Sequence, residues 1–396
     1  MSGGAQVARR IWVDGGRELQ RAEIARGAAG RIVAQRRLTR RAAQGRVRDL
    51  AVFPGLVDAH AHLQLAPLPA AAPREFLPWV GAVMAARAGM SSAALRATAR
   101  LHGLALQRDG VTTIGEIDSI GSSADVMSRL GLAGRCYQEL TGFHLDGAGA
   151  AALLRARRVG PRGDVAAGWS PHAPYSVSPA LFAAANRRRT PLAIHCAELP
   201  EEQQFLRTGR GPFRELLARL GRLPADFQAP GVGAVRYLER LGVLRRGVHL
   251  VHGQELERGD LPRLVAAGVP VVVCPGTIAW FARTPPPVDR WLEAGLRVAI
   301  GTDSAASNAA WSLRGELAQL GRWLPGLSDR QLLAMATTAG GIALHLPGAG
   351  RLRRGGRADF VALPVPDADD DAGPLAALVR GTGPLARVHC GGRRIA

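Results

Sequence analysis

The sequence contains no lysine: all 51 basic residues are arginines. A Schiff-base lysine, a phosphate-loop lysine and a carbamylated lysine bridging two metal ions are therefore excluded. Only four cysteines occur in 396 residues, without a CxxC pair, so we expect no disulfide framework and a reducing, cytoplasmic location. No apolar run approaches the roughly 18 residues of a membrane helix, and the amino-terminal residues lack a secretory apolar segment. No membrane association is expected.

Acidic residues are also few, and 32 Asp and Glu against 51 arginines give a formal net charge of +19. Such an excess first suggests nucleic-acid binding. The arginines, however, are spread over the whole chain, in groups such as 187–189, 245–246 and 353–354. Aromatic residues make up only 5% of the chain and do not interleave with a basic stripe. A non-catalytic, basic nucleic-acid-binding protein is therefore a remote alternative, and no nucleic-acid partner is expected.

A repeated pattern fills the middle of the chain: a short apolar, β-branched run followed by a longer segment with helical spacing. Eight such runs occur, at residues 52–59, 111–117, 132–140, 165–170, 192–196, 248–251, 269–274 and 296–300. Apolar strands that alternate with helices are typical of a parallel sheet. Eight units over roughly 250 residues favour a closed (β/α)8 TIM barrel, an α/β fold. We expect this barrel over residues 53–346.

The two ends of the chain have short alternating segments broken by glycine. These segments lie at residues 11–13, 31–34, 359–363 and 387–390. We expect residues 1–52 and 347–396 to pair as one small, composite β-sandwich domain beside the barrel. The acidic stretch 367–371 is expected to be a solvated loop.

Residues that can bind a metal follow the ends of three predicted strands. His60 and His62 follow the first run, His195 the fifth and Asp303 the eighth. The carboxyl ends of barrel strands meet at one rim, where active sites form, and residues two apart on a strand project to the same face. Three imidazoles and one carboxylate suit Zn²⁺, with Fe²⁺ as the alternative. We therefore expect one divalent metal ion at this rim.

The motifs around these residues resemble those of the amidohydrolase superfamily. They read P-G-L-V-D-A-H-A-H at 54–62, H-C-A-E at 195–198, L-V-H-G at 250–253 and G-T-D-S at 301–304. Their order is similar to that of the aminohydrolase branch, which holds nucleoside and base deaminases and triazine chlorohydrolases. Within it, S-P-H-A-P-Y-S at 170–176 looks most like the aminofutalosine deaminase group. Superfamily members with two metals usually bridge them through a carbamylated lysine, so this chain is expected to be mononuclear.

The resemblance implies a role for each matching residue. The four metal ligands are those named above, and Asp303 is also a general base. Glu198 matches the proton-shuttling carboxylate, and His252 matches the histidine that polarises the attacking water or the substrate. His172 matches a residue that contacts the substrate ring or sugar in nucleoside deaminases. The implied reaction is attack of a metal-activated hydroxide on an sp² carbon bearing an amino group, with release of ammonia.

The predicted function is therefore hydrolytic deamination of an amino-substituted heterocycle, purine nucleoside-like and, as the best single candidate, of the aminofutalosine type. The alternatives are another leaving group, as in triazine chlorohydrolases, and deamination of guanine or cytosine. The chain departs from the family pattern at Gly253, where cysteine is usual, and at 277–278, where Ser-Asn is common. The identity of the substrate is thus the least determined part of the predicted function. Its expected partner is this small heterocycle, and a homodimer is expected only because family members often form one.

Three further residues are candidates for substrate binding beside His172. Trp280 follows the seventh run, where it is placed either to stack on an aromatic base or to pack. Arg283, in the same loop, is a candidate partner for a substrate carboxylate or phosphate. Glu116, at the exit of the second run, is either a substrate contact or a hydrogen-bonded rim residue.

Overall fold

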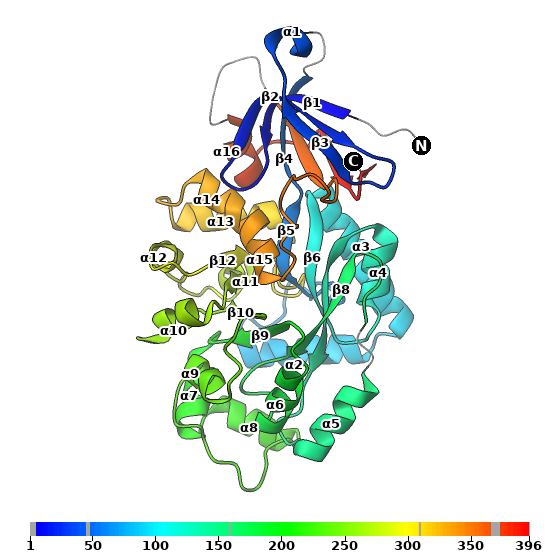
Figure 1. Cartoon of the computed structure of the whole chain (residues 1–396). Coiled ribbons are helices and arrows are strands. Elements are labelled where there is room, and N and C mark those ends of the chain that lie inside the picture. The colour runs from blue at the N-terminus through cyan, green and yellow to red at the C-terminus, as the bar shows by residue number, and fades with distance from the viewer. Residues whose placement is uncertain (1–4, 45–47, 158–159, 309, 366–372, 396) are drawn as a thin grey trace.

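The computed structural model in Figure 1 describes residues 5–44, 48–157, 160–308, 310–365 and 373–395. Eight parallel strands follow one another around a barrel in chain order. They are β5 (Leu56–Ala61), β6 (Val111–Asp118), β7 (Ala133–Leu140), β8 (Val165–Pro171), β9 (Leu192–Cys196), β10 (Val248–His252), β11 (Val271–Val273) and β12 (Val298–Ile300). The predicted α/β barrel is thus confirmed. Almost all of its strand residues are buried, which explains why the sequence shows continuous apolar runs there.

Helices alternate with these strands and cover the outside of the barrel (Figure 1). In chain order they are α2 (Phe76–Ala88), α3 (Ser92–Arg108), α4 (Ser123–Leu130), α5 (Gly147–Ala156), α6 (Pro179–Arg187), α7 (Pro200–Thr208), α8 (Pro212–Arg219), α9 (Ala234–Arg240), α10 (Asp260–Ala267), α11 (Pro275–Trp280), α12 (Val288–Glu293), α13 (Leu313–Trp323), α14 (Asp329–Ala334), the π-helix η1 (Met335–Ala339) and α15 (Gly340–Ala343). Two short helices, α1 (Arg40–Ala43) and α16 (Gly373–Val379), accompany the terminal segments. None of the described helices is long and apolar enough to span a membrane.

The first and last strands close the barrel beside the metal-binding motif. Asp303 N donates a hydrogen bond to His60 O at 3.0 Å, and His62 N donates to Asp303 O at 2.6 Å. Asp58 accepts hydrogen bonds from Thr302 Oγ1 at 2.6 Å and from Thr302 N at 3.1 Å. The closure between β5 and β12 therefore uses the backbone of three predicted ligands.

The two chain ends share a second sheet, as predicted. In spatial order its strands are β15 (Arg393–Arg394), β14 (Arg387–Cys390), β13 (Phe360–Pro364), β4 (Arg48–Pro54), β1 (Ala5–Trp12), β2 (Glu18–Arg26) and β3 (Ile32–Arg37). The junction is the antiparallel pairing of β4 with β13. The described strands form one hydrogen-bonded sheet, with its own apolar cluster. The exact domain boundaries remain a prediction, and the acidic stretch 367–371 lies outside the described residues.

One predicted strand is divided in the structure. The apolar run at 52–59 belongs to two sheets, because β4 ends at Pro54 and β5 begins at Leu56. Between them, Gly55 N donates a hydrogen bond to Asp359 O at 2.9 Å. A side chain at Gly55 would overlap the side chain of Thr112. Close packing at this glycine therefore lets the chain pass from the terminal sheet directly into the barrel.

Candidate metal centre

The four predicted ligands converge at the carboxyl ends of β5, β9 and β12. His62 Nε2 lies 3.3 Å from His195 Nε2. Asp303 Oδ1 lies 3.4 Å from His60 Nε2 and 3.6 Å from His62 Nε2. Two atoms that each bind a tetrahedral Zn²⁺ at about 2.0–2.1 Å are about 3.3 Å apart. The spacing of these side chains therefore fits one shared cation.

The charges of the four residues also fit a cation. Burial lowers the pKa of His60, and it lowers the pKa of His195 well below its usual value. Burial and then the neighbouring His60 lower the pKa of His62 to about 3. Neutral imidazole is the form that binds metals. Burial alone raises the pKa of Asp303, but the imidazoles of His60, His62 and His252 outweigh it and hold this pKa well below its usual range.

His60 gives the clearest sign that a ligand belongs here. Both of its ring nitrogens are buried, and neither has a hydrogen-bond partner among the described residues. An unpaired buried polar atom costs free energy, and a cation at Nε2 would remove part of that cost. His60 also belongs to two groups whose ligand atoms all lie within 4.8 Å of one another, one with His62 and His195 and one with His252 and Asp303.

Other side chains and carbonyls orient the ligands. His195 Nδ1 donates to the backbone oxygen of His172 at 2.9 Å, which turns Nε2 toward the cluster. Asp303 Oδ2 accepts hydrogen bonds from Thr277 Oγ1 at 2.7 Å and from Ser307 Oγ at 2.8 Å. Oδ1 is thereby left for the imidazoles. The sequence marked Thr277 only as a departure from the family pattern and gave no sign of Ser307.

Three residues at the site have left-handed backbone conformations, which are uncommon for residues other than glycine. The φ angle is +52° at Ala197, +76° at His252 and +58° at Asp303. Such conformations cost free energy and persist where the surrounding structure imposes them. Here His252 is the last residue of β10, while Ala197 and Asp303 follow the ends of β9 and β12.

Glu198 lies between a histidine and an arginine. Its Oε2 is 3.7 Å from His252 Nε2, and its Oε1 is 3.7 Å from Arg283 Nη1. Burial raises the pKa of Glu198 to about 7, although Arg283 opposes the rise. Burial lowers the pKa of His252 to about 4, so this imidazole is neutral. The sequence offered Arg283 as a partner for a substrate anion, whereas its nearest carboxylate in the structure is Glu198.

A second glutamate, which the sequence did not single out, fixes the loop of Glu198. Glu202 Oε2 accepts a hydrogen bond from Glu198 N at 2.9 Å, while its buried Oε1 has no hydrogen-bond partner in the described part of the chain. Burial raises the pKa of Glu202 to about 8. His172 lies beside His195, with ring centroids 4.7 Å apart, and its Nδ1 pairs with Ser176 Oγ at 2.7 Å. His172 is thus at the cluster, and its contact with a substrate stays a prediction.

An aromatic group from α2 packs against the segment that carries Arg283. Phe76 and Trp79 lie 5.8 Å and 5.3 Å from Phe281, measured between ring centroids. The Arg283 guanidinium lies 4.6 Å from the ring centroid of Phe281. Trp79 Nε1 donates to Ala306 O at 3.0 Å, which joins α2 to the loop after Asp303. Helix α2 was not predicted, because its residues are apolar on every side and show no helical period.

Trp280 is held by an arginine. The Arg74 guanidinium lies 3.6 Å from the ring centroid of Trp280, and Arg74 Nη1 donates to Trp280 O at 3.1 Å. One face of the indole is therefore covered by protein. Stacking of Trp280 on a substrate base remains a prediction. It would have to use the face of the indole opposite Arg74.

Both carboxylate oxygens of Glu116 accept hydrogen bonds from neighbouring protein groups. It is fully buried, its Oε2 accepts a hydrogen bond from Leu63 N at 2.9 Å, and its Oε1 accepts one from Ser123 Oγ at 2.8 Å. It therefore fixes the chain directly after His62. Of the two roles that the sequence allowed, these contacts favour the hydrogen-bonded rim residue over the substrate contact.

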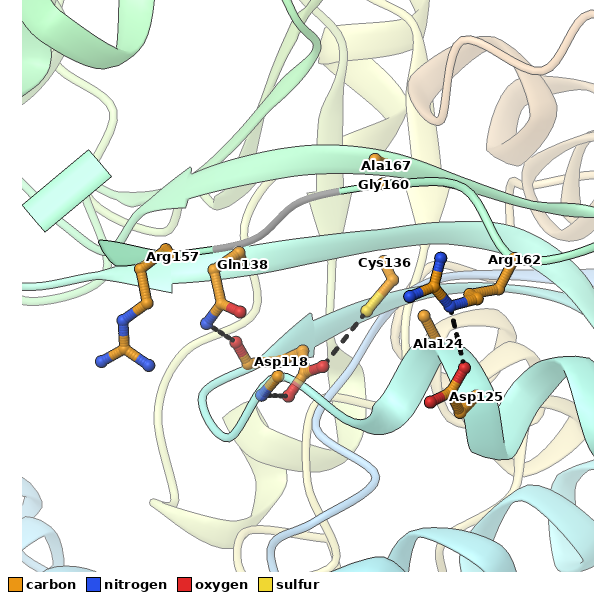
Figure 2. A pocket seen from close by; sticks show the side chains of 10 residues that line it. Asp118, Ala124, Asp125, Cys136, Gln138, Arg157, Gly160, Arg162 and Ala167 are labelled. Carbon is orange, nitrogen blue, oxygen red and sulfur yellow. Dashed lines mark hydrogen bonds and ion pairs between the residues drawn. The ribbon is translucent and has the colours of Figure 1, made fainter. Parts of the chain in front are cut away.

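The neighbouring Asp118 faces away from the cluster. Figure 2 shows its carboxylate next to Cys136, with Gln138 close by, at a cavity lined by residues from β6, β7, β8 and α4. Cys136 Sγ lies 3.5 Å from Asp118 Oδ2, and Gln138 Nε2 donates to Asp118 O at 2.6 Å. None of the residues that line this cavity belongs to the two described groups that could hold a metal ion.

Fold and site together define a (β/α)8 barrel whose strand ends carry groups of side chains that could hold a metal ion, with Glu198 Oε2 lying 3.7 Å from His252 Nε2 at the same place. The amidohydrolase family model matches residues 51–393, and the chain belongs to this family.

Two curated relatives cover most of the chain. An aminodeoxyfutalosine deaminase of Deinococcus radiodurans is 32% identical over 318 residues, which are 73% of this chain and 72% of that protein. A 5-methylthioadenosine/S-adenosylhomocysteine deaminase of Halobacterium salinarum is 28% identical over 333 residues, 79% of this chain and 72% of that protein. Both relatives are named as deaminases.

Solved structures support the fold. Helicobacter pylori aminofutalosine deaminase, in complex with methylthio-coformycin, superimposes with a TM-score of 0.82 at 20% identity, covering 99% of this chain and 100% of that one. A Xanthomonas campestris adenosine deaminase with bound zinc gives a TM-score of 0.78 at 22% identity, covering 98% and 92%. At these identities the likeness concerns the architecture alone.

Proposed function

We propose that the protein is a mononuclear, metal-dependent deaminase that converts an amino-substituted, purine nucleoside-like heterocycle to its oxo product and ammonia. The observation that carries this proposal is the position of Glu198 and His252 beside the four ligands. It is supported by the deaminase names of the two curated relatives, and zinc is supported by the zinc-bound structural neighbours. An aminofutalosine-type compound is the favoured substrate, because the most identical of these relatives is named for such a compound.

A divalent cation held by His60, His62, His195 and Asp303 would supply Lewis-acid activation of water near neutral pH. Asp303 accepts a proton from the attacking water, because its charged carboxylate lies among the ligands. Glu198, with a pKa of about 7, delivers a proton to the ring nitrogen beside the reacting carbon. Neutral His252 stabilises the developing oxygen. The water oxygen forms the new bond to carbon, and Asp303 passes the proton it accepted to the exocyclic amino group. The carbon–nitrogen bond then breaks with release of ammonia, and the proton of the new hydroxyl group returns to Glu198 as the oxo product forms.

The test is an ammonia-release assay with metal-reconstituted enzyme and a panel of substrates. The panel contains aminodeoxyfutalosine, 5-methylthioadenosine, S-adenosylhomocysteine, adenosine, guanine, cytosine and a chlorinated triazine. We expect ammonia from an adenine-type nucleoside, with aminodeoxyfutalosine giving the highest kcat/KM. Chloride release from the triazine without deamination of any nucleoside would contradict the proposal.

We also infer that the enzyme works in the cytoplasm. The four cysteines are all unpaired and buried, which suits a reducing compartment. Secretion into the medium of a native host culture, tested by fractionation and immunoblotting, would contradict this. The homodimer stays a prediction from the family resemblance, for sedimentation analysis to test.

A further inference from the structure

A cavity of about 430 Å³ lies between the barrel and the terminal sheet, at the end of the barrel opposite the metal centre. Its wall includes Thr113 and Ala133, near the first residues of β6 and β7, together with the segment 346–357 that leads from the barrel to β13. Five arginines line it: Arg31, Arg351, Arg353, Arg354 and Arg357. Cavities at such junctions between units are common ligand sites.

The two carboxylates in this cavity already have partners. Arg357 Nε lies 2.9 Å from Asp359 Oδ2, and Arg357 Nη1 also pairs with Asp164. Arg31 Nη2 lies 3.7 Å from the other oxygen of Asp164. The cavity therefore holds five guanidinium groups against only two carboxylates, and both carboxylates are engaged.

The other three arginines of the cavity have no partner among the residues that the structure describes. Within the described residues, the side chains of Arg351, Arg353 and Arg354 make no hydrogen bond or ion pair. Like charges that gather in a concave surface raise its potential and attract anions. A planar guanidinium binds the oxygens of a phosphate in pairs. These three groups are thus free to meet an anion that enters the cavity.

The backbone of the same segment is rich in glycine. Gly348 and Gly350 both line the cavity, and in the described part of the chain their N–H groups have no acceptor. The φ angle of Gly350 is +64°, a conformation that other residues rarely adopt, and a side chain there would overlap Thr337. Glycine-rich turns present backbone N–H groups to anions. Free N–H groups thus add to the arginine side chains.

We propose that this cavity binds a phosphate group, either as a free inorganic anion or as part of a small phosphorylated metabolite. A bound phosphate would join the terminal sheet to the base of the barrel. It would also give a specific partner to part of the arginine excess, including the 353–354 pair seen in the sequence. The site is separate from the metal centre, so the proposal does not depend on the deaminase activity.

The test is calorimetric titration of the metal-loaded protein with inorganic phosphate, pyrophosphate and a nucleoside monophosphate at constant ionic strength. The variant is Arg353→Gln/Arg354→Gln. Its matched control is Arg187→Gln/Arg188→Gln, which removes the same charge from an exposed pair at the end of α6. We expect the Kd of the best phosphate ligand to rise about tenfold or more in the first variant, since a hydrogen bond to a charged group contributes about 1.5 kcal/mol or more. It should be unchanged in the control.

The order of affinities identifies the form of the ligand. Tighter binding of the nucleoside monophosphate indicates a phosphorylated metabolite, and tighter binding of phosphate or pyrophosphate indicates a free anion. The single variant Arg351→Gln repeats the test if the double variant does not fold. Titration of His60→Ala separates the cavity from the metal centre, because that variant keeps every arginine of the cavity.

Three results would overturn the proposal. One is phosphate binding that survives Arg353→Gln/Arg354→Gln unchanged but disappears in His60→Ala, which would place the anion at the metal centre. Another is the absence of binding up to about 10 mM. The third is tight binding of a DNA oligonucleotide that both double variants weaken equally, which would indicate a general response to the net charge of +19.

Discussion

At the scale of single residues, Asp303 does two things. Its backbone closes the barrel against His60 and His62, and its side chain places Oδ1 3.4–3.6 Å from their Nε2 atoms, where it would complete the proposed ligand set. Thr277 and Ser307 hold the remaining oxygen. Loss of a group that orients a metal ligand typically costs about 10- to 100-fold in metal affinity or activity. Substitution of Thr277 or Ser307 should therefore weaken the proposed site without changing a ligand.

Replacing Thr277 by valine should therefore weaken the metal centre. Thr277→Val keeps the shape of the side chain but removes the hydrogen bond to Asp303 Oδ2. We expect metal affinity or activity to fall about 10- to 100-fold. Metal content after dialysis against graded chelator, together with kcat/KM at saturating zinc, measures both effects. Parent-like values in both measurements would show that Ser307 alone orients Asp303.

Glu198→Gln should separate proton transfer from metal binding. The amide keeps the shape of the side chain but cannot deliver a proton, so kcat should fall about 10²- to 10⁴-fold. Elemental analysis should still find one equivalent of metal, because Glu198 is outside the ligand set. His60→Ala is the paired control, and it should lose the metal. A metallated Glu198→Gln enzyme with parent-like turnover would refute the assigned role.

The arginine beside Glu198 should set the pH dependence of the reaction. Glu198 must be protonated to act as the acid, so kcat/KM should fall as the pH rises through its pKa of about 7. Arg283 lowers this pKa. In Arg283→Met the pKa rises, and the fall in kcat/KM should move to higher pH. A pH–rate profile that is identical in parent and variant would show that titration of Glu198 does not cause the fall in kcat/KM at high pH.

At the scale of elements, the sequence predicts the strands of the barrel better than the loops that finish the site. Buried parallel strands leave continuous apolar runs, and the ligands follow directly from the ends of β5, β9 and β12. The contacts of Arg283 and Trp280 depend instead on α2 and on loop packing between segments some 200 residues apart. Such contacts have no local pattern, so their partners, Glu198 and Arg74, could not be foreseen.

The terminal sheet contains a histidine whose neutral form is stabilised by the fold. Burial, helped by the neighbouring Arg26, Arg387 and Arg394, lowers the pKa of His389 to about 4. An unfolded chain, with a pKa near 6.5, binds this proton first as the pH falls. The stabilisation is therefore complete above about pH 6.5 and is lost progressively toward pH 4.

His389→Gln should reduce the loss of folding stability at low pH. We expect the parent to lose on the order of 1 kcal/mol more than the variant when the pH is lowered from 7.5 to 5. Urea denaturation at the two pH values gives the difference between the free energies of unfolding. An equal loss in parent and variant would mean that His389 is protonated in the folded sheet.

At the scale of the whole molecule, metal binding and stability should be linked. The cation would tie three strands together at the closure of the barrel, and a ligand at 100 times its Kd stabilises the folded state by about 2.7 kcal/mol. Chelation should therefore lower the Tm of the parent, and zinc should restore it. His60→Ala should show no response to either treatment. A parent Tm that is indifferent to metal would argue against a site formed in the folded state.

The closure between β5 and β12 also sets the order of events during synthesis on the ribosome. His60 and His62 leave the tunnel early, but Asp303 follows about 240 residues later, roughly 10 to 50 s at ordinary rates of translation. During this interval the nascent chain exposes a histidine pair with no carboxylate to complete it. A complete ligand set for the proposed cation would therefore form only late, after β12 and Asp303 have emerged, and the growing polypeptide has to stay soluble until then.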